Sequence, residues 1–230
     1  MFFNTFLSHR YFVKAIIIGG ILILFSINGK AQTALDTLPQ QPMAIKKKKP
    51  KSLLSKKEMR IAIQRAICDM VSPIDYSGRK QKFVGLKDIR QIKQMLCPGD
   101  ILIKRNEYQL TNIGIPGFWT HAAIYIGGEK EIDQMFDSIP LIYGLRASEI
   151  IKCRFPILYK RINNRQHGII EAIGKGVVIN PLSHCAKVDC LAAFRPKLSQ
   201  KARFISLLTA FKYYHVPYDF LFDFESDDAV

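Results

Sequence analysis

The 230-residue chain lacks the features of a disulfide-stabilised or metal-binding protein. It has only five cysteines, an odd number, and no Cys-x-x-Cys pair. A chain of this length can bury a core without disulfide bonds. No histidines and cysteines have the spacing of a zinc site, and no glycine-rich loop suits a phosphate. We therefore expect no metal and no other cofactor. Cys68 and Cys97 lie among apolar residues and are expected to be small core residues.

The first 31 residues have the order of a secretory signal peptide. Arg10 and Lys14 precede an apolar run over 15–27, and small residues then flank Ala31. The run is short for a membrane span, and no cysteine lies near the expected cleavage point for lipid attachment. We expect export to the periplasm or cell envelope. An uncleaved N-terminal anchor is the alternative.

Residues 32–53 have the composition of a basic linker rich in proline and lysine. Its lysines are Lys46, Lys47, Lys48, Lys49 and Lys51. They contribute five positive charges to the formal net charge of the whole chain, which is +15. Export argues against nucleic acid as the partner. Anionic lipid head groups are the better electrostatic match for an envelope protein. A solvated, disordered tether is the alternative.

Residues 54–230 are expected to form one α+β domain. Ser55 and Glu58 have the spacing of a capping box, which predicts a helix over 55–71. Further helices are expected over 86–96 and 198–214, and short strands over 101–104, 121–127, 169–173, 177–182 and 190–194. This order predicts a small, mostly antiparallel sheet or partial barrel packed by helices.

The connection over 129–167 gives mixed signals. The segment 139–151 has helical character, but Pro140 and Pro156 interrupt the pattern. A connection of this length is often a lid or a binding loop. A packing insert is the alternative, and the sequence does not choose between them.

Two polar residues on apolar strands are the candidate site. Alternation places His121 and the small Ala123 on one strand face. Glu171 shares a face with Ile169 and Ile173, where a carboxylate is costly unless a partner compensates it. We predict that Glu171 orients the His121 imidazole, because a carboxylate on one ring nitrogen fixes the tautomer. The alternatives are a structural histidine and a glutamate at a strand edge in water.

The remaining histidines and cysteines are weaker candidates. His184 precedes Cys185, and adjacent side chains of an extended segment point apart. His215 continues the apolar stripe of the last helix and is expected to be packed. Unpaired cysteines are mostly inert, so we expect no thiol with a depressed pKa beside His121.

Four segments follow one another over residues 97–224. They are Gly99-Asp100 with its strand, His121-Ala122-Ala123-Ile124-Tyr125-Ile126-Gly127, Ile170-Glu171-Ala172 with Gly176-Val177, and Pro217-Tyr218-Asp219. In this order they resemble the permuted papain-like cysteine hydrolases, the YiiX/YaeF group of the NlpC-type superfamily. The resemblance implies a papain-like fold whose catalytic halves are exchanged in chain order. It also implies that His121 is the catalytic histidine and Glu171 its supporting polar residue.

The chain departs from this family at the nucleophile. The resemblance implies a catalytic cysteine after the Tyr218-Asp219 segment, where a helix N-terminus and an imidazolium lower the thiol pKa. This sequence continues there into an acidic end, and no cysteine follows Cys190. We expect a domain truncated at its C-terminus. A natural loss of catalysis is the alternative.

The resemblance implies an exported cysteine-type amide or ester hydrolase that acts on cell-wall peptide or acyl-amide substrates. His121 would be its general base and Glu171 the group that orients it. One alternative is a non-catalytic envelope protein that binds a peptide or lipid on the same scaffold. Another is an envelope tether whose basic linker docks on an anionic membrane.

Overall fold

The computed structural model describes residues 55–75, 78, 82–113, 115, 117–136, 138–139, 144–164 and 168–220. The expected leader and basic linker lie outside these residues. In chain order the elements are α3 (Lys56–Val71), α4 (Leu86–Met95), β1 (Ile101–Arg105), the 3-10 helix η1 (Leu110–Ile113), β2 (His121–Gly127), α5 (Glu129–Phe136), α6 (Ala147–Arg154), α7 (Pro156–Asn164), β3 (Gly168–Ile173), β4 (Gly176–Pro181), α8 (Leu182–Ala186), β5 (Cys190–Phe194) and α9 (Gln200–Lys212).

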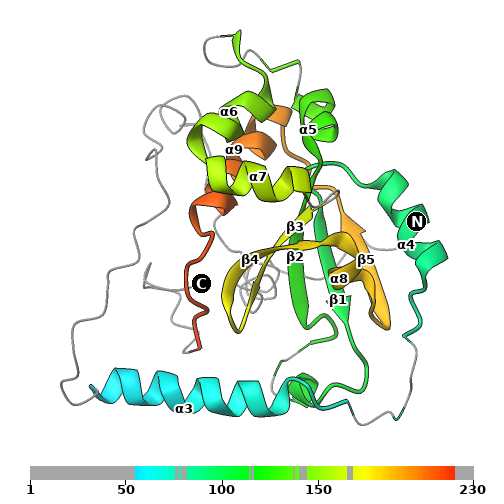
Figure 1. The fold of residues 1–230 in the computed structure, drawn as a ribbon. Coiled ribbons are helices and arrows are strands. Elements are labelled where there is room, and N and C mark those ends of the chain that lie inside the picture. Colours follow the sequence, from blue (N-terminus) through cyan, green and yellow to red (C-terminus); the bar gives the residue numbers. More distant parts are fainter. Residues whose placement is uncertain are drawn as a thin grey trace.

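The strands form one open sheet in the order β4-β3-β2-β1-β5, and every neighbouring pair is antiparallel (Figure 1). All five expected strands are present, and the α+β class is confirmed. The helices expected at both ends of the domain are present too. Ser55 and Glu58 form the predicted capping box at the start of α3.

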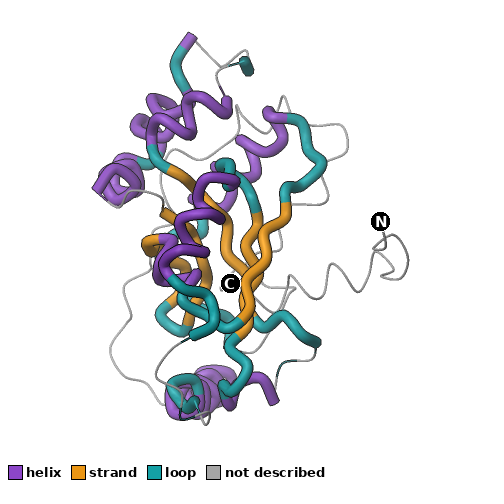
Figure 2. The backbone as a smooth tube through the Cα atoms, turned by 90° about the vertical axis from the view of Figure 1, so that its right-hand side faces the viewer, coloured by secondary structure: helices purple, strands orange, loops and turns teal. Residues whose placement is uncertain are grey.

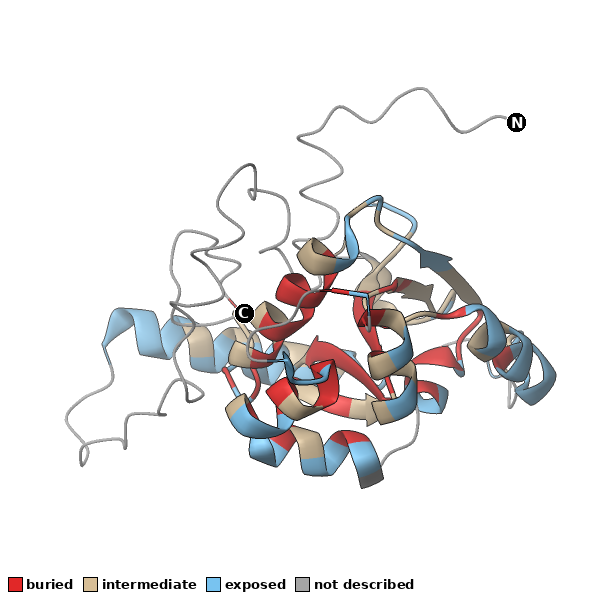
Figure 3. Ribbon diagram, turned by 90° about the horizontal axis from the view of Figure 1, so that it is seen from above, coloured by how far each residue is buried: buried red, intermediate tan, exposed pale blue. Residues whose placement is uncertain are grey.

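Helices α5, α6, α7 and α9 cover one face of the sheet and enclose the larger core cluster. The predicted stripe of α9 is buried and consists of Phe204, Leu207, Leu208 and Phe211; Arg203, Ile205 and Ser206 are buried too. The 129–167 connection contributes buried side chains from all three of its helices, among them Phe136, Ile151 and Leu158. These contacts support the packing interpretation of this connection. Figure 3 shows the buried residues gathered on the strands and on the inner sides of these helices.

The opposite face of the sheet carries a second cluster, to which α4 and α8 contribute. Leu102, Ala123, Tyr125 and Ile169 point to this face, together with the buried Cys185 of α8. The alternation predicted for β2 is therefore present. The same face carries the odd-numbered positions His121 and Glu171, so the candidate site lies on this face.

Helix α3 lies beyond one end of the strands, whereas α5, α6 and α9 lie toward the other end (Figures 1 and 2). None of the described helices combines the length and apolar character needed to cross a bilayer.

The chain after α9 is attached to the β3–β4 hairpin. The amide of His215 donates to Val177 O at 3.0 Å, and the amide of Val177 donates to Val216 O at 3.0 Å. Gly176 has φ +101°, and a Cβ there would collide with Val216 O, so the turn requires glycine.

Two sequence predictions are wrong. His215 is exposed, because α9 ends at Lys212 and His215 turns the chain with φ +68°. Cys68 and Cys97 are only half-buried, since α3 packs loosely and Cys97 lies in a turn before β1.

Candidate active site

The site begins with the pairing of β2 and β3. The register places Ala123 opposite Glu171, so His121 is the diagonal neighbour of Glu171 on the same sheet face. The His121 Nε2 atom lies 2.7 Å from Glu171 Oε2. The predicted contact between the imidazole and the carboxylate is present.

Glu171 is fully buried, with 0% of its side chain exposed. Its Oε2 atom is also 3.4 Å from Lys104 Nζ. Its Oε1 atom accepts a hydrogen bond from Asn180 Nδ2 at 2.8 Å and lies 3.1 Å from His184 Nδ1. Glu171 is therefore not a strand-edge side chain in water, because both of its oxygens have partners from four other residues.

The surroundings of Glu171 favour its ionised form. Burial alone would raise its pKa, but the hydrogen bond from His121, the charge of Lys104 and the hydrogen bond from Asn180 together hold the pKa well below its usual range. An ionised carboxylate only accepts hydrogen bonds. Hence Glu171 acts at neutral pH as a fixed negative acceptor.

Burial lowers the pKa of His121, and this effect outweighs the opposing hydrogen bond to Glu171; the positive charge of Lys104 lowers the pKa further. The ring is therefore neutral at pH 7. Because Glu171 accepts at Nε2, the proton of the neutral ring lies on Nε2, which leaves Nδ1 as the basic nitrogen. No described residue hydrogen-bonds to His121 Nδ1, and 19% of the side chain is exposed. The ring can thus accept a proton from a group that approaches Nδ1.

Three members of this cluster were missed by sequence reasoning. Lys104 lies opposite His121 in the β1–β2 register, and Asn180 lies on β4 beside Ile169. His184 was set aside as part of an extended segment, but it belongs to the helix α8. In α8 the 55% exposed His184 side chain reaches Glu171, while Cys185 points inward. Asn180 could have been found from the sequence, because it is a polar residue within an apolar run. The partners of Lys104 could be found only from the strand register.

Three of the described cysteines, Cys68, Cys185 and Cys190, do not present a thiolate to this ring. Cys185 is buried, and burial raises the pKa of its thiol to about 12. It makes no hydrogen bond to His121 in the described part of the structure. Burial also raises the pKa of Cys68 and Cys190. For these three residues, the prediction that no depressed thiol accompanies His121 is confirmed.

The Gly99-Asp100 segment has a structural role. Asp100 is buried and accepts hydrogen bonds from Arg195 Nε at 3.0 Å and Arg195 Nη2 at 2.8 Å. It also accepts the backbone amide of Cys97 at 2.8 Å. The Arg203 side chain packs directly over Gly99, which has φ +87° and leaves no room for a Cβ. These contacts fix the turn that leads into β1 and hence the position of Lys104.

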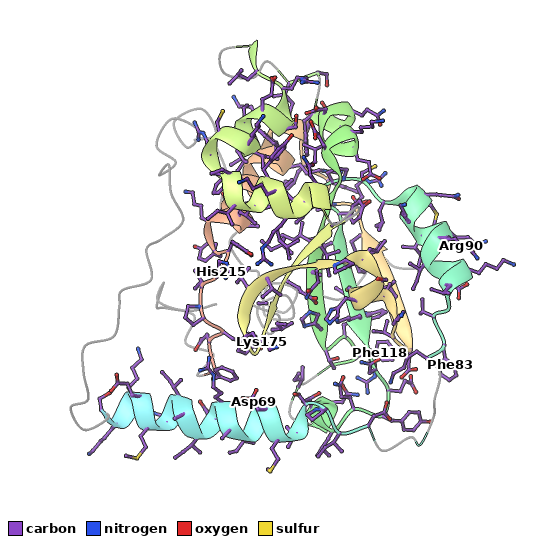
Figure 4. All side chains as sticks on the ribbon, viewed as in Figure 1. Asp69, Phe83, Arg90, Phe118, Lys175 and His215 are labelled. Carbon is purple, nitrogen blue, oxygen red and sulfur yellow. The ribbon has the colours of Figure 1, made fainter. Side chains whose placement is uncertain are left out.

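The segment after α9 reaches the end of the sheet at which β2 begins. The guanidinium of Arg65 in α3 lies 5.2 Å from the Phe220 ring, and a Cβ at Gly174 would contact Phe220 and Asp69. Figure 4 shows Lys175 at the hairpin tip and Asp69 on α3 at this same end. Because β3 runs antiparallel to β2, the hairpin tip lies at the end of the sheet that carries His121.

In the described residues, no three histidine, cysteine, aspartate or glutamate side chains are arranged to hold a metal ion. The His121–Glu171 pair is instead suited to proton transfer, because it joins a neutral imidazole to a fixed carboxylate.

A model of the permuted papain-like amidase enzymes, the YaeF/YiiX C92 family, matches residues 95–229. No curated protein and no solved structure matches the chain. The matched region contains β1, the His121–Glu171 pair and the Tyr218-Asp219 segment. Since the match covers more than half of the sequence, the chain belongs to the YaeF/YiiX family of permuted papain-like amidases.

Proposed function

We propose that the protein is a cysteine-type amide hydrolase in which His121 is the general base and Glu171 orients it. The observation that carries this proposal is the 2.7 Å contact between a neutral ring and a fully buried, ionised carboxylate. Membership of the amidase family implies peptide or amide substrates. Within that class we propose cell-wall peptides or acyl-amide compounds.

The proposed reaction uses the free Nδ1 atom of His121. Nδ1 takes the proton of a thiol, and the thiolate attacks the carbonyl carbon of the amide. When the tetrahedral intermediate collapses, the C–N bond breaks and the imidazolium returns its proton to the leaving amine. A water molecule, deprotonated by the same nitrogen, then hydrolyses the thioester and releases the acid and the thiol. Glu171 remains ionised throughout and accepts the hydrogen bond that the protonated Nε2 donates.

On the resemblance we propose the thiol after Tyr218-Asp219, and the described chain, which extends to Phe220, reaches the end of the sheet that carries His121. The test joins the chain at Val230 to the cysteine-bearing segment of a family member. We expect this fusion to hydrolyse a fluorogenic amide, and His121→Ala to abolish the activity. The matched control is His215→Ala, which removes an exposed imidazole outside the site. An unchanged rate in His121→Ala would contradict the proposal.

A second candidate function is binding of a peptide or lipid without cleavage. It is favoured by Cys185, whose buried thiol has a pKa raised to about 12 and makes no hydrogen bond to His121 in the described part of the chain. Under this proposal the 230-residue chain binds an amide ligand in calorimetry. It would not be labelled covalently at the site by a thiol-reactive substrate mimic. Covalent labelling of a cysteine, blocked by His121→Ala, would exclude this candidate.

Export and attraction to anionic membranes through Lys46–Lys51 are also proposals, supported by the sequence alone. The mass of the mature protein recovered from the producing cell tests cleavage after residue 31. A full-length mass with no export contradicts the signal peptide.

A further inference from the structure

Four apolar residues of α3 face away from the protein. Met59, Ile63, Ile67 and Met70 are between 50% and 66% exposed. Their spacings of four, four and three residues place them on one side of the helix axis, and we call this set the α3 stripe. The partly buried residues, which face the body of the protein, are instead Ile61, Gln64, Cys68 and Val71. The helix has no fully buried residue.

The charges of α3 are distributed unevenly around the helix. Lys56 and Arg60 lie on the same side of the helix as the α3 stripe, three residues before Met59 and Ile63, respectively. The acidic residues lie on the other side of the helix. Glu58 accepts the amide of Ser55 at the N-cap, and Asp69 lies beside Gly174 of the hairpin. The stripe is therefore bordered by cations and free of carboxylates.

The position of α3 leaves the stripe accessible. The helix lies beyond one end of the sheet, and its surface is largely exposed (Figures 1 and 3). Sixteen residues form a rod about 24 Å long, and the stripe runs along this length. The contacts of α3 with the rest of the described chain, such as Arg65 on Phe220, come from the opposite side of the helix.

We propose that the α3 stripe lies in the interfacial region of an anionic lipid bilayer. An apolar face bordered by lysine and arginine is the pattern of helices that lie in the membrane plane. The stems of Lys56 and Arg60 can lie along the acyl boundary while their charges reach lipid phosphates. The five lysines at 46–51 precede the helix directly and add charge of the same sign. A second copy of the stripe fits less well, because an antiparallel pairing would bury the cations of each helix against the apolar end of the other.

The first test measures contact between lipid and α3 in the full chain, with a tryptophan placed on the helix. Ile67→Trp and Ile157→Trp each add one tryptophan to the native Trp119, and Ile157 is an exposed apolar residue of α7 that serves as the matched control. With equimolar phosphatidylcholine and phosphatidylglycerol vesicles that contain brominated lipid, we expect quenching and a blue shift for Ile67→Trp. Ile157→Trp should behave like the unsubstituted chain. Equal quenching of the two variants would overturn the proposal.

The second test asks whether the stripe itself makes the contact. In the Ile67→Trp chain, Ile63→Glu should raise the lipid concentration needed for half-maximal quenching about tenfold, because burying one isoleucine contributes roughly this factor to affinity. Ile157→Glu in the same background should leave the quenching unchanged. The leader and the lysines are the same in every variant, so they do not account for a difference. If Ile63→Glu instead breaks up a dimer in lipid-free sedimentation, the stripe is an interface between copies and the proposal is wrong.

Discussion

Replacing Glu171 by glutamine tests whether the buried carboxylate stabilises the fold as its contacts indicate. Glutamine keeps the size of the side chain but offers one acceptor oxygen and one NH₂ group. In the native site, His121 and Lys104 approach one oxygen, while Asn180 and His184 approach the other. In either orientation of the amide, its NH₂ group points at two of these side chains, which in the native site each approach a carboxylate oxygen. The substitution also removes the countercharge of Lys104.

The expected loss follows from the burial of the pair. Breaking a fully buried ion pair by removing one partner costs about 3–5 kcal/mol. Lys104 keeps 16% of its side chain exposed, so we expect the lower end, about 3 kcal/mol of unfolding free energy for Glu171→Gln. Adding Lys104→Met removes the uncompensated cation. The double variant should therefore recover about 1–2 kcal/mol relative to the sum of the single losses.

Urea unfolding at pH 7, followed by the fluorescence of Trp119, measures these values. Glu129→Gln is the matched control, because its carboxylate accepts a hydrogen bond from Asn163 in an exposed setting. It should change stability by less than about 0.5 kcal/mol. If Glu171→Gln were no more destabilising than this control, or if Lys104→Met showed no coupling to it, the electrostatic account of the site would be refuted.

Three further predictions concern pH, thiol reactivity and backbone conformation. The folded pKa of His121 is lowered by burial, so the unfolded chain binds its proton more readily; stability should fall as pH drops below about 6.5, and His121→Phe should flatten this part of the pH profile in urea titrations. Cys185, with a thiol pKa of about 12, should be alkylated by iodoacetamide at pH 8 far more slowly than the exposed Cys153, as followed by mass spectrometry; equal rates would contradict the burial. Gly176→Ala should lower the unfolding free energy by about 2 kcal/mol or more, because it adds a collision with a backbone carbonyl to a positive φ. Gly144 also has a positive φ, but a Cβ there would meet open space. Gly144→Ala should therefore cost only about 1 kcal/mol in the same assay, and equal losses for the two variants would show that the collision at Gly176 is relieved.

The elements with regular periodicity were predictable from the sequence. The strands of the sheet and the buried stripe of α9 follow from alternation and from the spacing of apolar residues. The contact between His121 and Glu171 was predictable because a carboxylate within an apolar strand requires a partner. The 2.7 Å contact shows that the partner is present, while the catalytic roles of the two residues stay a prediction.

The missing parts depended on information that periodicity does not contain. Lys104 contacts Glu171 across β2, and only the strand register brings them together. Pro156 appeared to interrupt the 129–167 connection, but it is the first residue of α7, a position that tolerates proline. His215 follows the apolar stripe of α9 in sequence, yet it adopts a left-handed conformation after the helix and is exposed.

The β3–β4 hairpin sets the positions of two distant stretches of the chain relative to each other. One of its strands holds Glu171, and the other pairs with residues 215–216, which lead to Tyr218. Because side chains alternate along a strand, a slip of one residue would turn Glu171 to the opposite side of the sheet and carry the later segment with it. The acid and the C-terminal stretch would then both lose their alignment with His121 in a single event, so selection for that alignment reduces to selection for one turn.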